Sequence, residues 1–173
     1  MSEIQVIDNF LDEKDFEGLK QIFYDEIPWT FTDILNEDDL LCDQIYNYQY
    51  VHNVYYRQEP VSRYFNNVIP LLTKLDARAL VRCKVNSISR DKEIVIHGFH
   101  TDMEYPEEHS LGLDGMKTAI LYLNTNNGYT CFKEGTKIES VANRCVIFPA
   151  HYKHSGTTCT DVPRRLAINL VYF

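Results

Sequence analysis

Glycines divide the second half of the chain into short apolar segments, and this pattern restricts the fold more than any other sequence feature. Only Gly18 precedes residue 98, whereas the other six glycines lie at or after it. Glycine lets the backbone turn sharply, and Asn126-Asn127-Gly128 and Glu134-Gly135 are typical turn sequences. The apolar segments are short enough to be strands, at 80–88, 94–99, 118–123, 129–132, 145–148 and 166–173. Many short strands without helices between them indicate a β-sandwich or an open barrel.

The first half contains longer elements. Asp12 can cap a helix over 12–26, whose apolar residues recur at helical spacing. A second helix is predicted to begin at Pro60, because proline suits a first helical turn, and Pro70 is expected to kink or split it. Between the helices, tyrosines alternate with polar residues in the period of a strand, at Tyr46, Tyr48 and Tyr50. The sequence therefore predicts helices followed by a jelly-roll-like β core.

The length of 173 residues suits one domain with one hydrophobic core. We expect a single domain over 1–173, in which 1–78 is a mainly helical lead-in and support and 79–173 is the β core. The N-terminus is acidic and has no leader-like apolar run, and no apolar run approaches the ~20 residues of a membrane-spanning helix. These features predict a protein that does not interact with a membrane.

The cysteines and the net charge restrict the compartment and the partners. Five cysteines without a C-x-x-C pair fit reduced, buried thiols better than disulfides or a cysteine zinc site, which predicts a reducing compartment, the cytoplasm. The net charge of −8 and the pI near 5.2 argue against nucleic acid as a partner. A local basic run is the counter-argument, formed by Arg82, Lys84, Arg90 and Lys92.

Two histidines and an aspartate carry the strongest chemical signal. Residues two apart on a strand point to the same face, so His100 and Asp102 can present an imidazole and a carboxylate to one metal ion. His154 follows another predicted strand and can supply a third ligand. Two histidines and one carboxylate on one side of a metal leave the opposite positions open, as in non-haem Fe(II) oxygenases. Taken alone, His100 and Asp102 are more simply explained as a hydrogen-bonded surface pair.

An arginine follows His154 by eleven residues, at the start of the apolar last segment. Arg165 can form a bidentate pair with a carboxylate and so hold a dicarboxylate ligand. A structural salt bridge is the alternative role for a buried arginine at this place. Arg164 would replace Arg165 if the strand register were shifted by one residue, since such a shift turns each side chain to the other face.

Five motifs follow one another in the last 75 residues: His100-x-Asp102, Ala119-Ile120-Leu121-Tyr122-Leu123-Asn124, Gly128-Tyr129-Thr130-x-Phe132, Asn143-Arg144-x-Val146-x-Phe148-Pro149, and His154-x-Gly156 with Arg165. Together they resemble the prolyl 4-hydroxylase-like branch of the 2-oxoglutarate- and Fe(II)-dependent oxygenases. The resemblance covers about 75 of the 173 residues, and the joint pattern is far more specific than any one motif.

The resemblance implies a mostly β fold with N-terminal helices, whose core is a double-stranded β-helix, a cupin-like jelly roll. It implies that the three candidate ligands bind Fe(II), that Arg165 binds the distal carboxylate of the cosubstrate 2-oxoglutarate, and that Tyr122 hydrogen-bonds to that carboxylate. Asn86, on the strand before the His-x-Asp motif, is expected to reach the cosubstrate or the substrate. With O₂, such a dioxygenase hydroxylates its substrate and releases succinate and CO₂, and ascorbate supports turnover.

The branch implies a peptidyl residue such as proline as the substrate, and a small molecule is the alternative. A nucleic-acid demethylase of the same superfamily is disfavoured by the net charge. Two readings from other classes remain. A non-catalytic jelly-roll metal-binding module would not need Arg165, and a zinc hydrolase would need a general base among Glu104, Glu107 and Glu108.

Other histidines and tyrosines compete for roles at the site. His97 lacks a carboxylate two residues later and is expected at the rim or behind the ligands, and His151 lacks the x-Gly that follows His154. His52 and His109 belong to no motif and are expected to be solvated or structural. The tyrosines of 46–56 could line a substrate groove, but packing is the preferred interpretation.

Overall fold

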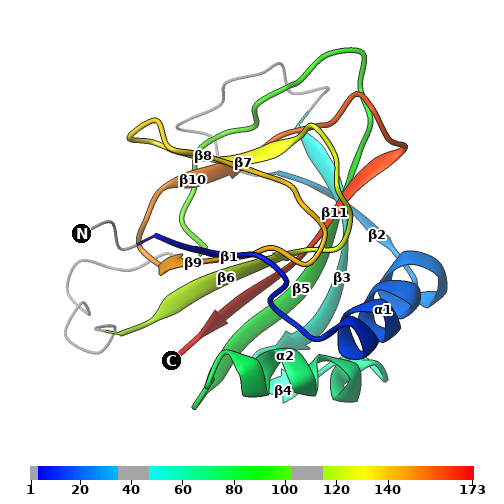
Figure 1. Ribbon diagram of the computed structural model, residues 1–173, viewed down its shortest axis with the longest axis vertical. Helices are drawn as coiled ribbons and strands as arrows, with labels where there is room; N and C mark the ends of the chain where they lie inside the picture. Colours follow the sequence, from blue (N-terminus) through cyan, green and yellow to red (C-terminus); the bar gives the residue numbers. More distant parts are fainter. Residues whose placement is uncertain (1–3, 35–46, 103–114) are drawn as a thin grey trace.

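The strands form two antiparallel sheets that lie opposite each other (Figure 1). The computed structural model describes residues 4–34, 47–102 and 115–173. The main sheet has eight strands in the order β1-β9-β6-β11-β5-β3-β2, with β4 paired to β3. Its strands are β1 Gln5–Ile7, β2 Thr30–Asp33, β3 Tyr48–Tyr56, β4 Glu59–Pro60, β5 Leu80–Ser89, β6 Lys117–Tyr122, β9 Cys145–Pro149 and β11 Arg164–Tyr172. The small sheet contains β7 Tyr129–Phe132, β8 Lys137–Glu139 and β10 His154–Gly156.

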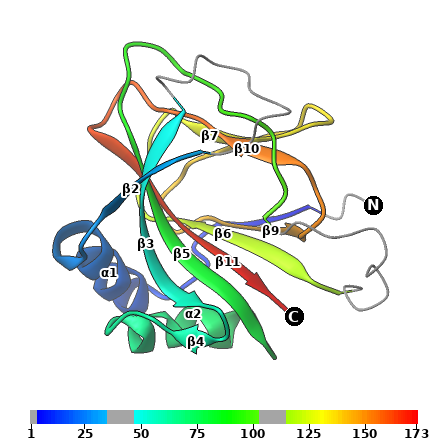
Figure 2. The ribbon, with the colours of Figure 1, turned by 180° about the vertical axis from the view of Figure 1, so that it is seen from behind.

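The two faces of the main sheet differ in chemistry, because side chains alternate along each strand. One face is covered by helices and is apolar; the helices are α1 Glu13–Gln21, the π-helical turn η1 Ile22–Glu26, the 3-10 turn η4 Phe65–Val68 and α2 Ile69–Lys74. This core includes Phe16, Leu19, Leu71, Leu166, Ile168 and Leu170. The alternate residues of β11 face the small sheet and are Arg165, Ala167 and Asn169. The strands β2, β3, β5 and β11, seen side by side in Figure 2, thus carry polar side chains on the face that positions the site.

The fold class is confirmed, and most predicted elements are found. The first helix has the predicted cap, because the Asp12 carboxylate accepts a hydrogen bond from the Asp15 backbone N–H at 3.0 Å. Five of the six predicted strands of the second half occur as β5, β6, β7, β9 and β11. No helix among the described residues is long and apolar enough to cross a membrane.

Two element predictions are wrong. Pro60 ends the edge strand β4, and the second helical segment begins only at Phe65. Pro70 lies in the first turn of α2, directly after η4, so the helical segment is divided into a 3-10 turn and an α-helix, and the split predicted at Pro70 is found. The segment 94–99 is not a strand, since it makes only the isolated bridge between Ile96 and Thr157. The lead-in also contributes the strands β1 to β4 to the main sheet in addition to its helices.

Candidate metal and cosubstrate site

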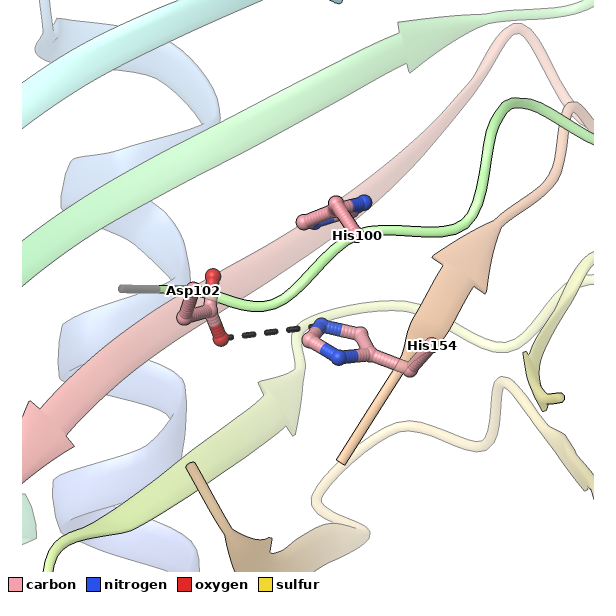
Figure 3. A group of neighbouring side chains, drawn as sticks. All are labelled: His100, Asp102 and His154. Atoms are coloured by element: carbon pink, nitrogen blue, oxygen red, sulfur yellow. Dashed lines mark ion pairs between the residues drawn. The ribbon is translucent and has the colours of Figure 1, made fainter. Parts of the chain in front are cut away.

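The two candidate histidine ligands are joined by their own backbones. His100 and His154 form an isolated antiparallel bridge in which each N–H donates to the other residue's carbonyl at 2.9 Å. Asp102 follows His100 by two residues, and the ligand atoms of all three side chains lie within 4.8 Å of one another (Figure 3). The Asp102 Oδ2 atom lies 3.5 Å from Nε2 of His154. The bridge, which joins His100 outside any strand to the first residue of β10, therefore brings the predicted triad together.

Three strands of the main sheet hold the Asp102 carboxylate. Arg82 of β5 donates to Oδ1 at 2.6 Å, while Thr118 of β6 and Asn169 of β11 each donate to Oδ2 at 3.0 Å. Burial works to raise the pKa of Asp102, but the charges of His154, Arg82 and Lys84 outweigh it and hold the pKa well below its usual range. The carboxylate is thus ionised and fixed in orientation before any metal binds.

Hydrogen bonds to backbone carbonyls set the tautomers of both histidines. Nδ1 of His100 lies 3.3 Å from the Gly98 carbonyl, and Nδ1 of His154 lies 3.0 Å from the Tyr152 carbonyl. A carbonyl only accepts, so each Nδ1 carries the proton and each Nε2 is left as a metal ligand. Burial, followed by the charge of His154, lowers the pKa of His100 to about 3, which keeps its imidazole neutral. Two imidazoles and one carboxylate are a donor set that suits Fe(II).

The triad lies in the wall of a cavity of about 820 Å³, a size typical of small-molecule sites. The inner faces of β3, β5 and β11 form much of the wall, together with residues of the small sheet. The cavity is lined by charged and amide side chains as well as apolar ones, among them Asn53, Arg82, Lys84, Asn86, Arg165 and Asn169. Such a cavity can hold a metal, an anionic cosubstrate and part of a polar substrate together.

Arg165 lies in this cavity and is only 5% exposed. Its Nε donates to the Ser140 hydroxyl at 2.7 Å and its Nη2 to the Thr130 hydroxyl at 2.9 Å, and no described carboxylate pairs with it. Two glycines make room for the side chain, since a Cβ at Gly128 would meet Cδ of Arg165 at 2.9 Å and one at Gly156 would meet Nη1 at 3.2 Å. A buried cation without an acidic partner in the described chain suits an anionic ligand.

The neighbouring arginine points to the other face of the sheet. Arg164 donates to the Tyr24 carbonyl at 2.5 Å, and its guanidinium lies 4.2 Å from the centre of the Tyr24 ring. Since Arg164 binds the helical layer, Arg165 is the arginine of this pair that faces the cavity.

The two other predicted cosubstrate residues lie close to Arg165 or on the cavity floor. Tyr122 is fully buried, donates to the Thr130 hydroxyl at 2.8 Å and has the Arg165 guanidinium 5.3 Å from its ring centre. Burial raises the pKa of Tyr122, so its phenol stays protonated. Asn86 lines the cavity, and its buried Oδ1 has no hydrogen-bond partner among the described residues. Their roles toward a cosubstrate stay predictions.

The remaining histidines and tyrosines do not join the triad. His97 is buried in the cavity wall, and His151 is exposed. His52 is held by the Pro28 carbonyl at 2.9 Å and the Ser62 hydroxyl at 2.8 Å, which makes it structural. Of the described tyrosines in 46–56, Tyr56 alone lines the cavity. His109, Tyr46, and the candidate bases Glu104, Glu107 and Glu108 lie outside the described residues.

Sequence reasoning missed the residues that surround the ligands. Arg82 and Lys84 were noted only as part of a basic run, and Thr118 and Asn169 were not singled out. A usable signal exists in β5, where basic and amide residues alternate with the apolar Cys83 and Val85. This alternation marks a strand with one face on the apolar core and one face on a polar cavity.

Solved structures share this fold at low sequence identity. A protein of the 2OG-Fe(II) oxygenase family from Burkholderia pseudomallei superposes with a TM-score of 0.70 at 13% identity, over 98% of this chain and 84% of the other. A prolyl hydroxylase from Trichoplax adhaerens, in complex with a hypoxia inducible factor peptide fragment, gives 0.67 at 15% identity, over 100% and 84%. HygX from Streptomyces hygroscopicus, with nickel, 2-oxoglutarate and hygromycin B bound, gives 0.60 at 11% identity, over 98% and 82%.

No protein-family model and no curated protein sequence matches the chain. The similarity therefore rests on the fold and on the geometry of the site. The three triad residues could hold a metal ion, and the solved structure of HygX, which has this fold, is described with nickel and 2-oxoglutarate bound. The chain has the double-stranded β-helix fold of the 2-oxoglutarate- and Fe(II)-dependent oxygenases, with His100, Asp102 and His154 arranged as its facial triad.

Proposed function

We propose that the protein is an Fe(II)- and 2-oxoglutarate-dependent dioxygenase, formed as one domain by residues 1–173, that hydroxylates its substrate and releases succinate and CO₂. The observation that carries the proposal is the pairing of two features in one cavity. His100, Asp102 and His154 form a metal triad at one place, and Arg165 is buried at another without a described acidic partner. A non-catalytic metal-binding module would have no use for such an arginine.

Each residue has a binding or positioning task in this reaction. The triad would hold Fe(II), Arg165 would bind the distal carboxylate of 2-oxoglutarate, and Tyr122 and Asn86 would complete the cosubstrate site. When bound, Fe(II) would supply the activation of O₂, coupled to oxidation of 2-oxoglutarate. Arg82 keeps the ligand carboxylate ionised through their ion pair of 2.6 Å. The apolar strand residues around the triad, such as the fully buried Phe148, exclude water from the metal.

The first substrate class that we propose is a peptidyl residue such as proline. The Trichoplax prolyl hydroxylase shares the fold and is described with a peptide fragment. A polar small molecule is the second class, because the cavity wall on β3 and the turn after it carries Gln49, Asn53 and Gln58. HygX, described with hygromycin B, shows that the same fold accepts such a ligand. The acidic net charge disfavours nucleic acid.

We also propose the cytoplasm as the compartment of the protein. The described cysteines are free and buried, at Cys83, Cys131, Cys145 and Cys159. Free thiols are typical of proteins in a reducing compartment, where Fe(II) is also kept reduced.

Succinate formation tests the proposed function. The purified protein is incubated in air with Fe(II), ascorbate and 2-oxoglutarate, without a substrate, beside His100→Ala and the exposed-histidine control His151→Ala. We expect slow succinate release by the wild type and by His151→Ala, and none by His100→Ala. Isothermal titration of 2-oxoglutarate into Mn(II)-loaded protein runs in parallel, because tight coupling can suppress turnover without substrate. Absence of both turnover and 2-oxoglutarate binding in the wild type would refute the proposal.

A further inference from the structure

A lysine without a described partner faces the cavity beside the metal triad. Lys84 on β5 pairs with Asn169 of β11 on one side and with Asn53 of β3 on the other, and all three residues line the cavity. Residues that pair across strands point to the same face, so Lys84 is the direct neighbour of the asparagine that donates to Asp102. No hydrogen bond or ion pair within the described part of the chain involves the Lys84 ammonium group.

The charges around Lys84 favour an anionic ligand. Asp102 is the acid that acts on Lys84, but its oxygens already accept hydrogen bonds from Arg82, Thr118 and Asn169. The described charged residues of the cavity wall are two acids and four bases: Asp33, Asp102, Arg57, Arg82, Lys84 and Arg165. A divalent metal at the triad would add further positive charge. A carboxylate at the metal end of the cavity would offset this excess.

Lys84 and Arg165 lie at separate positions along the same wall of the cavity. Asn169, which pairs with Lys84, lies four residues after Arg165 on β11, which is roughly 13 Å of strand. The long side chains of Lys84 and Arg165 both reach the cavity from these two positions. Between them the inner face carries Ala167 of β11 and, opposite it, Asn86 of β5. The small side chain of Ala167 leaves space above the sheet. The Oδ1 atom of Asn86 is buried and has no hydrogen-bond partner among the described residues. An acyclic diacid has space to lie along this face.

Resting on the proposed function, we propose that Lys84 is a second cationic binding residue for 2-oxoglutarate, which holds the carboxylate at the metal end while Arg165 holds the distal one. The lysine acts by charge and hydrogen bonding, and it transfers no proton. Its charge orients the keto acid toward the triad and offsets the desolvation of the carboxylate.

Calorimetry on the Mn(II)-loaded protein without O₂ tests the proposal, since binding is then measured without turnover. Lys84→Met removes the charge at similar length, Lys84→Arg keeps the charge, and Lys74→Met is the matched control at an exposed lysine at the end of α2. We expect Lys84→Met to weaken 2-oxoglutarate binding by roughly tenfold to a hundredfold, as for loss of a hydrogen bond to a charged group. Lys84→Arg is expected to retain most of the affinity, and the control all of it. Lys84→Gln repeats the test should the methionine variant fold poorly.

A second probe identifies which carboxylate Lys84 binds. The compound 2-oxobutyrate keeps the keto acid but lacks the distal carboxylate. We expect Lys84→Met to lower the affinity for both compounds by the same factor, whereas Arg165→Met lowers only the affinity for 2-oxoglutarate. Unchanged 2-oxoglutarate binding in Lys84→Met, or a loss confined to 2-oxoglutarate, would overturn the assignment while leaving the proposed function intact. A wild type that binds neither probe would refute the proposed function and this inference with it.

Discussion

The two consecutive arginines at the start of β11 should respond to the same substitution in opposite ways. In Arg164→Met, a charged hydrogen bond of 2.5 Å to the Tyr24 carbonyl and a cation–π contact of 4.2 Å are lost. Such a hydrogen bond contributes ~1.5–3 kcal/mol and such a contact ~0.5–1 kcal/mol. Since Arg164 is half-exposed, we expect the free energy of unfolding to fall by about 2 kcal/mol, with 2-oxoglutarate affinity unchanged.

Arg165→Met should give the reverse result. The substitution removes two hydrogen bonds, of 2.7 and 2.9 Å, but it also removes a buried charge that no described acid offsets. The desolvation of such a charge costs several kcal/mol. Removing this cost nearly cancels the loss of the two hydrogen bonds, so we expect the free energy of unfolding to change by less than about 1 kcal/mol. The affinity for 2-oxoglutarate should fall at least ~100-fold, because two charged hydrogen bonds to the distal carboxylate are lost.

Urea unfolding without 2-oxoglutarate and calorimetric titration of the Mn(II)-loaded protein measure the two quantities on the same preparations. Wild-type protein and the double variant complete the set, since contributions on opposite faces of the strand should add. A result in which Arg165→Met loses more stability than Arg164→Met and keeps its 2-oxoglutarate affinity would refute the reasoning. It would identify Arg165 as a structural residue, the alternative role that the sequence left open.

Three further predictions concern the surroundings of the site and the core. Gly156→Ala places a Cβ 3.2 Å from Nη1 of Arg165 and should weaken 2-oxoglutarate binding several-fold in calorimetry without changing Mn(II) affinity. Thr118→Val removes a donor to the triad carboxylate and should lower Mn(II) affinity by about tenfold, measured by paramagnetic resonance; an unchanged affinity would count against the role of that hydroxyl. Burial raises the pKa of Cys83 and of Cys145 to about 12, so neither thiol should react with a disulfide reagent at pH 8 until the protein unfolds, and labelling at native protein rates would contradict this.

The sequence was most informative where periodicity and chemistry agree. The short apolar segments 80–88 and 166–173 predict the strands β5 and β11, and the turn at Gly135, which has a φ of +102°, is where Glu134-Gly135 predicts it. The grouping of His100, Asp102 and His154 was also predictable, because the joint pattern of five motifs is far more specific than the His-x-Asp spacing alone. The turn depends on local sequence alone, whereas the triad also depends on the long-range bridge between His100 and His154.

The failures arise where tertiary pairing decides. Pro60 fits the first turn of a helix as well as an edge strand, and its pairing with Tyr55 selects the strand. The segment 94–99 has strand-like composition, but its partners offer only single bridges. The three hydrogen bonds to the Asp102 carboxylate require Arg82 and two residues on other strands to lie side by side. The pairing register that places them there cannot be read from a single sequence.

The backbone bridge between His100 and His154 separates the placement of the metal ligands from their identity. Both bridge hydrogen bonds join main-chain atoms, at 2.9 Å, so the frame does not depend on which side chains it carries. Exchanging either imidazole for another donor would alter the metal preference and leave the two positions facing each other. The backbone bridge therefore keeps the ligand positions in place when a side chain is exchanged. For protein engineering, this means that metal selectivity can be changed one ligand at a time without redesigning the surrounding sheets.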